Sequence, residues 1–187
     1  RQLYGGAIAC FVPDRFVDVS SLREVPDHQE VFTDAQADES VIVEILNLAP
    51  GNSLEEAAAV HWKSLLKLNR AQASSIGEVA VVDFQDTLPH FTCPPAVTVQ
   101  PGVLLLMGHM KAPKFNEAAT NSIDVFVGLI RLEQQTSDIL VILNSATEVS
   151  AESSSAQSFL SPDPTGSLGL FKQIISSFRI VDWGLFP

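Results

Sequence analysis

Apolar residues in the second half of the chain follow the spacing of β-strands. In the stretch 123–132, Ile123, Val125, Val127 and Leu129 share one side, and Phe126, Ile130 and Leu132 share the other. Strands that are apolar on both faces need a cover on each face, which helices usually provide. Further strands are expected at 78–84, 97–110 and 138–144. The link 133–137 is too short for a parallel crossover, so 123–132 and 138–144 should form an antiparallel hairpin.

Two stretches carry the spacing of amphipathic helices. Ser53 stands three residues before Glu56, a capping-box pattern, and the apolar positions that follow predict a helix from 53 to about 69. Ser167 is expected to cap a last helix with the apolar stripe Leu168, Phe171, Ile174, Ile175 and Phe178. The serine-rich stretch 145–166 before it is predicted to be a mobile surface loop.

The first quarter of the chain mixes short strands with loops. Residues 3–12 are interpreted as one strand with a bulge at Gly5-Gly6, and 14–27 as mostly loop with one helical turn at 19–22. Strands are expected at 30–33 and 40–48. The residues therefore predict an α+β fold with a largely antiparallel sheet of five to seven strands. At this length we expect a single domain, 1–187.

Composition narrows the classes of partner. The chain is 46% hydrophobic, 18% charged, and carries a formal net charge of −11 with a pI near 4.6. Such a surface repels nucleic acid and anionic membrane. No apolar run approaches the roughly 20 residues of a spanning helix, and residues 1–12 lack the pattern of a signal peptide. We expect a soluble intracellular protein whose two cysteines, Cys10 and Cys93, stay reduced.

The negative charge is concentrated near the start of the chain. Nine acids and two arginines, Arg15 and Arg23, fall within 14–44, a net −7 of the −11. The acids are Asp14, Asp18, Glu24, Asp27, Glu30, Asp34, Asp38, Glu39 and Glu44. One interpretation is a solvated face, and the other is a patch that complements a basic partner. Interleaved Val17, Val19 and Leu22 suggest a segment packed against the core, which favours the patch.

Motifs for catalysis or cofactor binding are not evident in the sequence. It lacks a Gly-rich phosphate loop, and its four histidines show no ligand spacing, so neither a cofactor nor a metal is expected. His61, on the apolar face of the first helix, is expected to be a satisfied structural histidine. Cys93 in Thr-Cys-Pro-Pro is more readily a loop residue than a nucleophile.

A long ungapped string carries a resemblance to a known family. Residues 3–8 read Leu-Tyr-Gly-Gly-Ala-Ile, and 22–32 read Leu-Arg-Glu-Val-Pro-Asp-His-Gln-Glu-Val-Phe. These strings resemble the N-terminal signature of the Ran guanine nucleotide release factor (Mog) family. Residues 40–46, 129–132, 136–140, 178–182 and 185–186 are similar to later parts of the same family.

The resemblance implies both a fold and a function. The fold is an α/β/α sandwich with a six-stranded, mostly antiparallel sheet flanked by helices, shared with the photosystem PsbP proteins. The function is binding of the small GTPase Ran, release of its guanine nucleotide, and support of nuclear protein import, in the nucleus and also the cytoplasm. The family's Ran-binding acids correspond to Asp27 and Glu30, and Asp18 and Arg23 lie in the same matching stretch. We expect a monomer that is a regulator and not an enzyme.

Two other functions stay open on the sequence. One is a PsbP-like ligand-binding or assembly module without activity toward a GTPase. The other is an enzyme with Cys93 as nucleophile and a base that is distant in the chain.

Overall fold

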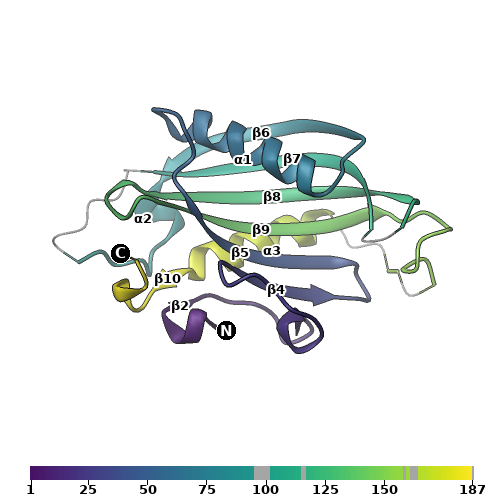
Figure 1. Ribbon diagram of the computed structural model, residues 1–187, viewed down its shortest axis with the longest axis horizontal. Coiled ribbons are helices and arrows are strands. Elements are labelled where there is room, and N and C mark those ends of the chain that lie inside the picture. Colours follow the sequence, from purple (N-terminus) through teal and green to yellow (C-terminus); the bar gives the residue numbers. More distant parts are fainter. Residues whose placement is uncertain (95–101, 115–116, 158, 161–163, 187) are drawn as a thin grey trace.

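A seven-stranded antiparallel sheet forms the centre of the computed structural model, which describes residues 1–94, 102–114, 117–157, 159–160 and 164–186 (Figure 1). Its order is β3-β4-β5-β9-β8-β7-β6. The strands are β3 (Val17–Asp18), β4 (Gln29–Asp34), β5 (Glu39–Asn47), β6 (Ala73–Asp83), β7 (Gly102–Pro113), β8 (Thr120–Leu132) and β9 (Ser137–Glu148). The expected count of six strands is therefore wrong. Strand β3 has only two residues, too few to show a period in a stretch that we predicted as loop.

Helices α1 (Leu54–Leu68) and α3 (Pro164–Ser177) cover opposite faces of this sheet (Figure 1). Alternate side chains of β8 divide as predicted. Val125, Val127 and Leu129 belong to the core beneath α1, and Phe126 and Ile130 to the core beneath α3. The short helix α2 (Phe84–Thr87) follows β6. The expectation of an α+β fold with a large antiparallel sheet is confirmed.

Two glycines let the helices approach the sheet closely. A Cβ atom on Gly108 of β7 would lie 2.5 Å from the Trp62 ring of α1. One on Gly128 of β8 would lie 2.7 Å from Cδ1 of Ile175 in α3. Each helix therefore packs a large side chain over a position that has none.

The predicted hairpin and the predicted start of the first helix are both confirmed. Strands β8 and β9 pair antiparallel from Leu132–Ser137 outward, across the 3-10 turn η3 (Glu133–Gln135). At α1, Ser53 Oγ accepts a hydrogen bond from Glu56 N at 3.2 Å. The Glu56 carboxylate in return accepts from Asn52 N at 2.7 Å, one residue earlier than an ideal capping box.

The first ten residues differ from the prediction of one bulged strand. They form β1 (Gln2–Leu3), the 3-10 turn η1 (Tyr4–Gly6) and β2 (Ile8–Ala9). Gly5 and Gly6 take positive φ values of 65° and 99°, so they turn the chain instead of bulging a strand. Strand β2 also pairs with β10 (Arg179–Ile180), which completes a second, three-stranded sheet.

The serine-rich stretch is another correction. Strand β9 continues to Glu148, and Ser153 and Ser155 are buried beyond it. Ser153 Oγ donates a 2.8 Å hydrogen bond to Glu117, so serine hydroxyls anchor this stretch to the body of the protein. Ser167 lies inside α3, which begins at Pro164, and is not its cap.

The other predicted strands are present in the structure, but they begin and end at slightly different residues than predicted. The helical turn predicted at 19–22 is the 3-10 turn η2 (Val19–Ser21). The expected strand start at 97–101 lies outside the described residues. In the described part of the chain, no helix has the length and apolar character needed to cross a bilayer.

Candidate functional site

The structure divides the nine acids of 14–44 into three groups by exposure. Asp14, Asp18, Glu24 and Asp27 are exposed, and Glu30 and Asp38 are half-buried. The side chains of Asp34, Glu39 and Glu44 are buried. Only the first group is free to form a surface for a partner, so the acidic segment is partly a contact surface and partly a structural element.

Three of the four predicted site residues lie on the edge connection from β3 to β4. Asp18 caps η2, because its carboxylate accepts a 2.8 Å hydrogen bond from Ser20 N. Arg23 is exposed and donates a long, 3.4 Å hydrogen bond to the Glu24 carbonyl oxygen. Asp27 occupies the turn before β4, and its exposed carboxylate has no hydrogen-bond partner in the described part of the chain. Asp27 is therefore the most available of the three acids among the four predicted residues.

Glu30, the fourth predicted residue, has a structural contact. Its Oε1 accepts a 2.6 Å hydrogen bond from the backbone N–H of Tyr4 in η1. The Tyr4 hydroxyl lies 2.9 Å from the carbonyl oxygens of both His28 and Val43. Burial and the nearby Glu30 and Glu44 carboxylates raise the pKa of Tyr4, so the hydroxyl stays a donor. Glu30 thus joins the N-terminal turn to the start of β4.

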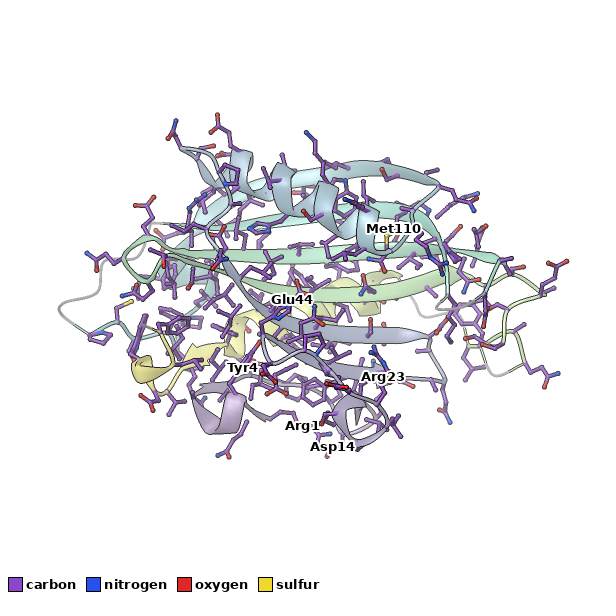
Figure 2. The ribbon with its side chains drawn as sticks, in the orientation of Figure 1. Arg1, Tyr4, Asp14, Arg23, Glu44 and Met110 are labelled. Carbon is purple, nitrogen blue, oxygen red and sulfur yellow. The ribbon has the colours of Figure 1, made fainter. Side chains whose placement is uncertain are left out.

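Glu44 is the other carboxylate close enough to act on Tyr4, and the two side chains are drawn near one another in Figure 2. Its carboxylate accepts a hydrogen bond from the Gln29 side chain of the neighbouring strand. Burial raises the pKa of Glu44, which makes it a carboxylate that is costly to ionise.

A charge cluster that the sequence did not predict holds two of the three buried acids. Arg15 donates to Asp34 and to Glu39, each at 2.7 Å. Glu39 also accepts from the hydroxyls of Ser145 and Ser167, at 3.2 and 3.1 Å. Burial lowers the pKa of Arg15, but the hydrogen bonds to the two carboxylates outweigh it and raise that pKa. The charges of Arg15 and the acids were visible in the sequence, but their pairing depends on strand register and on α3.

Two apolar side chains are exposed among the surface acids. Val17 is 51% exposed and Leu22 is 73% exposed, whereas Val19 and Val31 are buried. The prediction that Val17 and Leu22 pack against the core is therefore wrong. An exposed leucine in the same stretch of chain as the exposed Asp18, Glu24 and Asp27 offers a partner both apolar area and charge.

Other groups considered in the sequence have structural surroundings. His61 Nε2 lies 2.8 Å from the buried Asp138 carboxylate, as expected for a satisfied histidine. Both cysteines are free thiols; Cys93 is exposed, and partial burial raises its pKa, which lowers its thiolate fraction. The described residues contain no group of three or more His, Cys, Asp or Glu side chains placed to hold a metal ion.

Known proteins resemble this chain over nearly its full length. The family model for the Ran-interacting Mog1 protein matches residues 1–146. A probable ran guanine nucleotide release factor of Dictyostelium discoideum is 36% identical, with 100% of this chain and 95% of the relative covered. The Ran guanine nucleotide release factor of Danio rerio is 35% identical, with 100% and 98% covered. Nuclear import protein MOG1 of Saccharomyces cerevisiae is 30% identical, with 99% and 83% covered.

A solved structure is similar in fold as well as in sequence. The crystal structure of the Saccharomyces cerevisiae Ran-binding protein Mog1p matches with a TM-score of 0.71 and 27% identity, covering 100% of this chain and 97% of that one. The resemblance carried by the N-terminal strings is therefore confirmed by matches that extend far beyond them. This chain belongs to the Ran-interacting Mog1 protein family.

Proposed function

We propose that this chain binds the small GTPase Ran, promotes release of its bound guanine nucleotide, and supports nuclear protein import. The observation that carries the proposal is the exposed acidic surface around Leu22 and Asp27, in a chain whose relatives are named for these roles. The chain acts as one Ran-binding domain, 1–187, and as a monomer, in the nucleus and also the cytoplasm. Its net charge of −11 disfavours nucleic acid and anionic membrane as partners.

The proposed contact surface consists of Leu22 and the exposed charged residues beside it. Asp27 makes the direct ionic contact, since its carboxylate is exposed and unpaired among the described residues. Asp18, at the end of β3, and Arg23 precede it in the stretch of chain before β4. Glu30 serves both as a site residue and as the support of η1.

The mechanism requires no covalent chemistry from this chain. A GTPase holds its nucleotide through Mg²⁺, a lysine and backbone amides around the phosphates. A partner that binds the empty GTPase better than the loaded one shifts the equilibrium toward release. Carboxylates such as Asp27 provide that preference if they pair with basic groups that the phosphates otherwise neutralise. The expected kinship with PsbP proteins stays a prediction.

Release of a fluorescent nucleotide from loaded Ran tests the proposal. Adding this protein should accelerate the loss of signal in a saturable way. Excess free nucleotide should dissociate the complex, because coupling between two ligands is reciprocal. An unchanged release rate at saturating protein would leave a passive Ran binder, and absence of binding would refute the proposal altogether.

A further inference from the structure

The edge strand β6 lies at the opposite end of the large sheet from β3 and the proposed Ran surface (Figure 1). We propose that β6 and the groove between it and α3 form a second docking site. Its occupant is an extended segment of a partner protein that pairs with β6, carries apolar side chains, and is positively charged. This site does not depend on the proposed function.

Strand β6 lacks several of the usual protections of an edge. It spans Ala73–Asp83, and among the described residues it pairs only with β7. Natural edges are guarded by lysine, proline or a very short strand, because unpaired backbone groups attract another strand. The opposite edge, β3, is two residues long, whereas β6 contains neither lysine nor proline.

Exposed apolar side chains line the face of β6 that looks toward α1. Ile76, Val79 and Val81 are 48%, 43% and 48% exposed. They pair across the sheet with Gly108, Leu106 and Leu104 of β7, which belong to the α1 side. A strand added beside 78–83 would bury Val79 and Val81, as cross-strand neighbours in a sheet do.

The other face of β6 borders an apolar groove of about 270 Å³. Ala80 and Val82 of β6 and Met107 of β7 form its floor, and Leu168 and Phe171 of α3 form its wall. Met107 is itself 36% exposed. A strand added beside β6 would point every second side chain toward this groove, because side chains alternate between faces.

The bulge in β6 limits the length of the added strand. Pairing with β7 shifts register between Ile76 and Glu78, next to Gly77. The regular part of the edge is therefore 78–83. A strand of about six residues, roughly 20 Å long, fits along it.

Charge identifies the kind of partner. Glu78 and Asp83 are exposed at the two ends of this regular part, and Glu78 also borders the groove. Lys172 of α3 lines the far side of the groove, so the negative charge lies along the strand edge itself. A second copy of this chain would bring the same two carboxylates and a further net charge of −11. A segment from another protein with lysine or arginine near each end of its apolar stretch complements the edge instead.

Selection from a displayed library of random peptides about ten residues long, long enough to span the edge, tests the proposal. The library is panned in parallel on the full chain, on the β6 variant Val79→Lys, and on Leu68→Lys, so that each variant gains one lysine. Leu68 is 73% exposed on α1, so it matches the change in an exposed apolar residue away from the edge. Circular dichroism and thermal unfolding confirm that both variants stay folded.

We expect the full chain and Leu68→Lys to enrich the same basic peptides with alternating apolar residues, and the β6 variant to lose them. The enriched peptide, made synthetically, should bind at least about tenfold more weakly to the β6 variant. A central proline in the peptide should also weaken binding, because it removes a backbone donor. Absence of such enrichment, or equal binding to all three proteins, would overturn the proposal. A dimer of the full chain that disappears in the β6 variant would overturn it too, by assigning the edge to a second copy.

Discussion

Oε1 of Glu30 lies 2.6 Å from the backbone nitrogen of Tyr4 and accepts its hydrogen bond. The contact joins the strand that follows the proposed Ran surface to a turn in which Tyr4, Gly5 and Gly6 all have positive φ. Glu30 and Asp27 are three positions apart, yet one supports the fold and the other is exposed to solvent. Substitutions at the two positions should therefore separate loss of fold from loss of contact.

Asp27→Ala should weaken Ran binding with almost no effect on stability. An exposed substitution usually changes the free energy of unfolding by within about 0.5 kcal/mol. If the carboxylate is buried against basic groups of Ran, its loss costs about 2–5 kcal/mol of binding free energy. Titration calorimetry measures the binding term, and urea unfolding measures the stability term.

Glu30→Ala should lower both the affinity for Ran and the free energy of unfolding. It leaves the Tyr4 N–H without its acceptor, at a cost of about 1–3 kcal/mol in stability.

Glu152→Ala, which removes an exposed acid far along the chain, is the charge-matched control for Asp27→Ala and should leave Ran binding unchanged. If Glu152→Ala weakens Ran binding as much as Asp27→Ala, net charge alone is responsible and Asp27 is not a contact.

The buried pair of His61 and Asp138 should be essential for stability. Asp138 accepts from His61 and from Ala49 N, each at 2.8 Å, and lies 3.7 Å from Arg131 Nε. Asp138→Ala would leave the Arg131 charge buried without a counter-ion, which costs about 3–5 kcal/mol in the free energy of unfolding.

The free energy of unfolding of Asp138→Ala is measured by urea titration, and a second aspartate–histidine pair provides the control. Asp124 and His109 lie 2.9 Å apart, but both side chains are about a third exposed. Asp124→Ala should therefore cost only about 0–1 kcal/mol in the same urea titration. Equal losses in the two variants would contradict the importance of burial at Asp138.

Two glycine-to-alanine changes should shift stability in opposite directions. Gly108→Ala would place a Cβ 2.5 Å from the Trp62 ring, and overpacking of this kind costs about 1–3 kcal/mol. Gly169→Ala, in helix α3, meets nothing within 4 Å and should gain about 1 kcal/mol from helix propensity. Thermal unfolding followed by circular dichroism compares both variants, and a stabilising Gly108→Ala would contradict the close packing of α1.

Glu44 should make the protein less stable at neutral pH than at acidic pH. Burial raises its folded pKa above the unfolded value, so its favourable contribution is complete below the unfolded pKa, about 4.3, and is lost as pH rises through the folded pKa. Glu44→Gln should keep the contact with Gln29 and raise the melting temperature at about pH 7, with the gain shrinking toward pH 4.

Glu24→Gln removes an exposed carboxylate from the same segment and provides the comparison for Glu44. Its melting temperature should follow that of the unchanged chain across the pH range. A Glu44→Gln gain that stays constant from neutral to acidic pH would show that ionisation is not the cause.

Strong periodicity explains which elements were predictable from sequence. The alternation in 123–132 and the capping pattern at Ser53 depend on neighbours in the chain, and β8, β9 and α1 appear where expected. Strand β3 was missed, and Ser167 was wrongly predicted to be a helix cap, for the opposite reason. Both depend on partners that are distant in sequence, since Val17 pairs with Thr33 and Ser167 contacts Glu39.

The sequence predicted which residues belong to the candidate site, but not which of them are exposed. The sequence string directed attention to Asp18, Arg23, Asp27 and Glu30. Which acids are buried depends on Arg15 reaching Asp34 and Glu39, a contact set by the fold of β4 and β5. The exposed Leu22 has no local signal, because apolar residues near an amphipathic turn are equally consistent with burial.

The pairing of β2 with β10 sets the order in which the two sheets can form during synthesis on the ribosome. Ile8 and Ala9 pair on one side with Leu3 and Gln2 of β1. Their partners on the other side are Ile180 and Arg179, which are translated more than a hundred and sixty residues later. The turn that Glu30 supports belongs to this late-closing sheet, through β1 and β2. The nascent chain can assemble its large sheet earlier, but the small sheet that contains β1 and β2 gains its last strand only after residue 180 has been added.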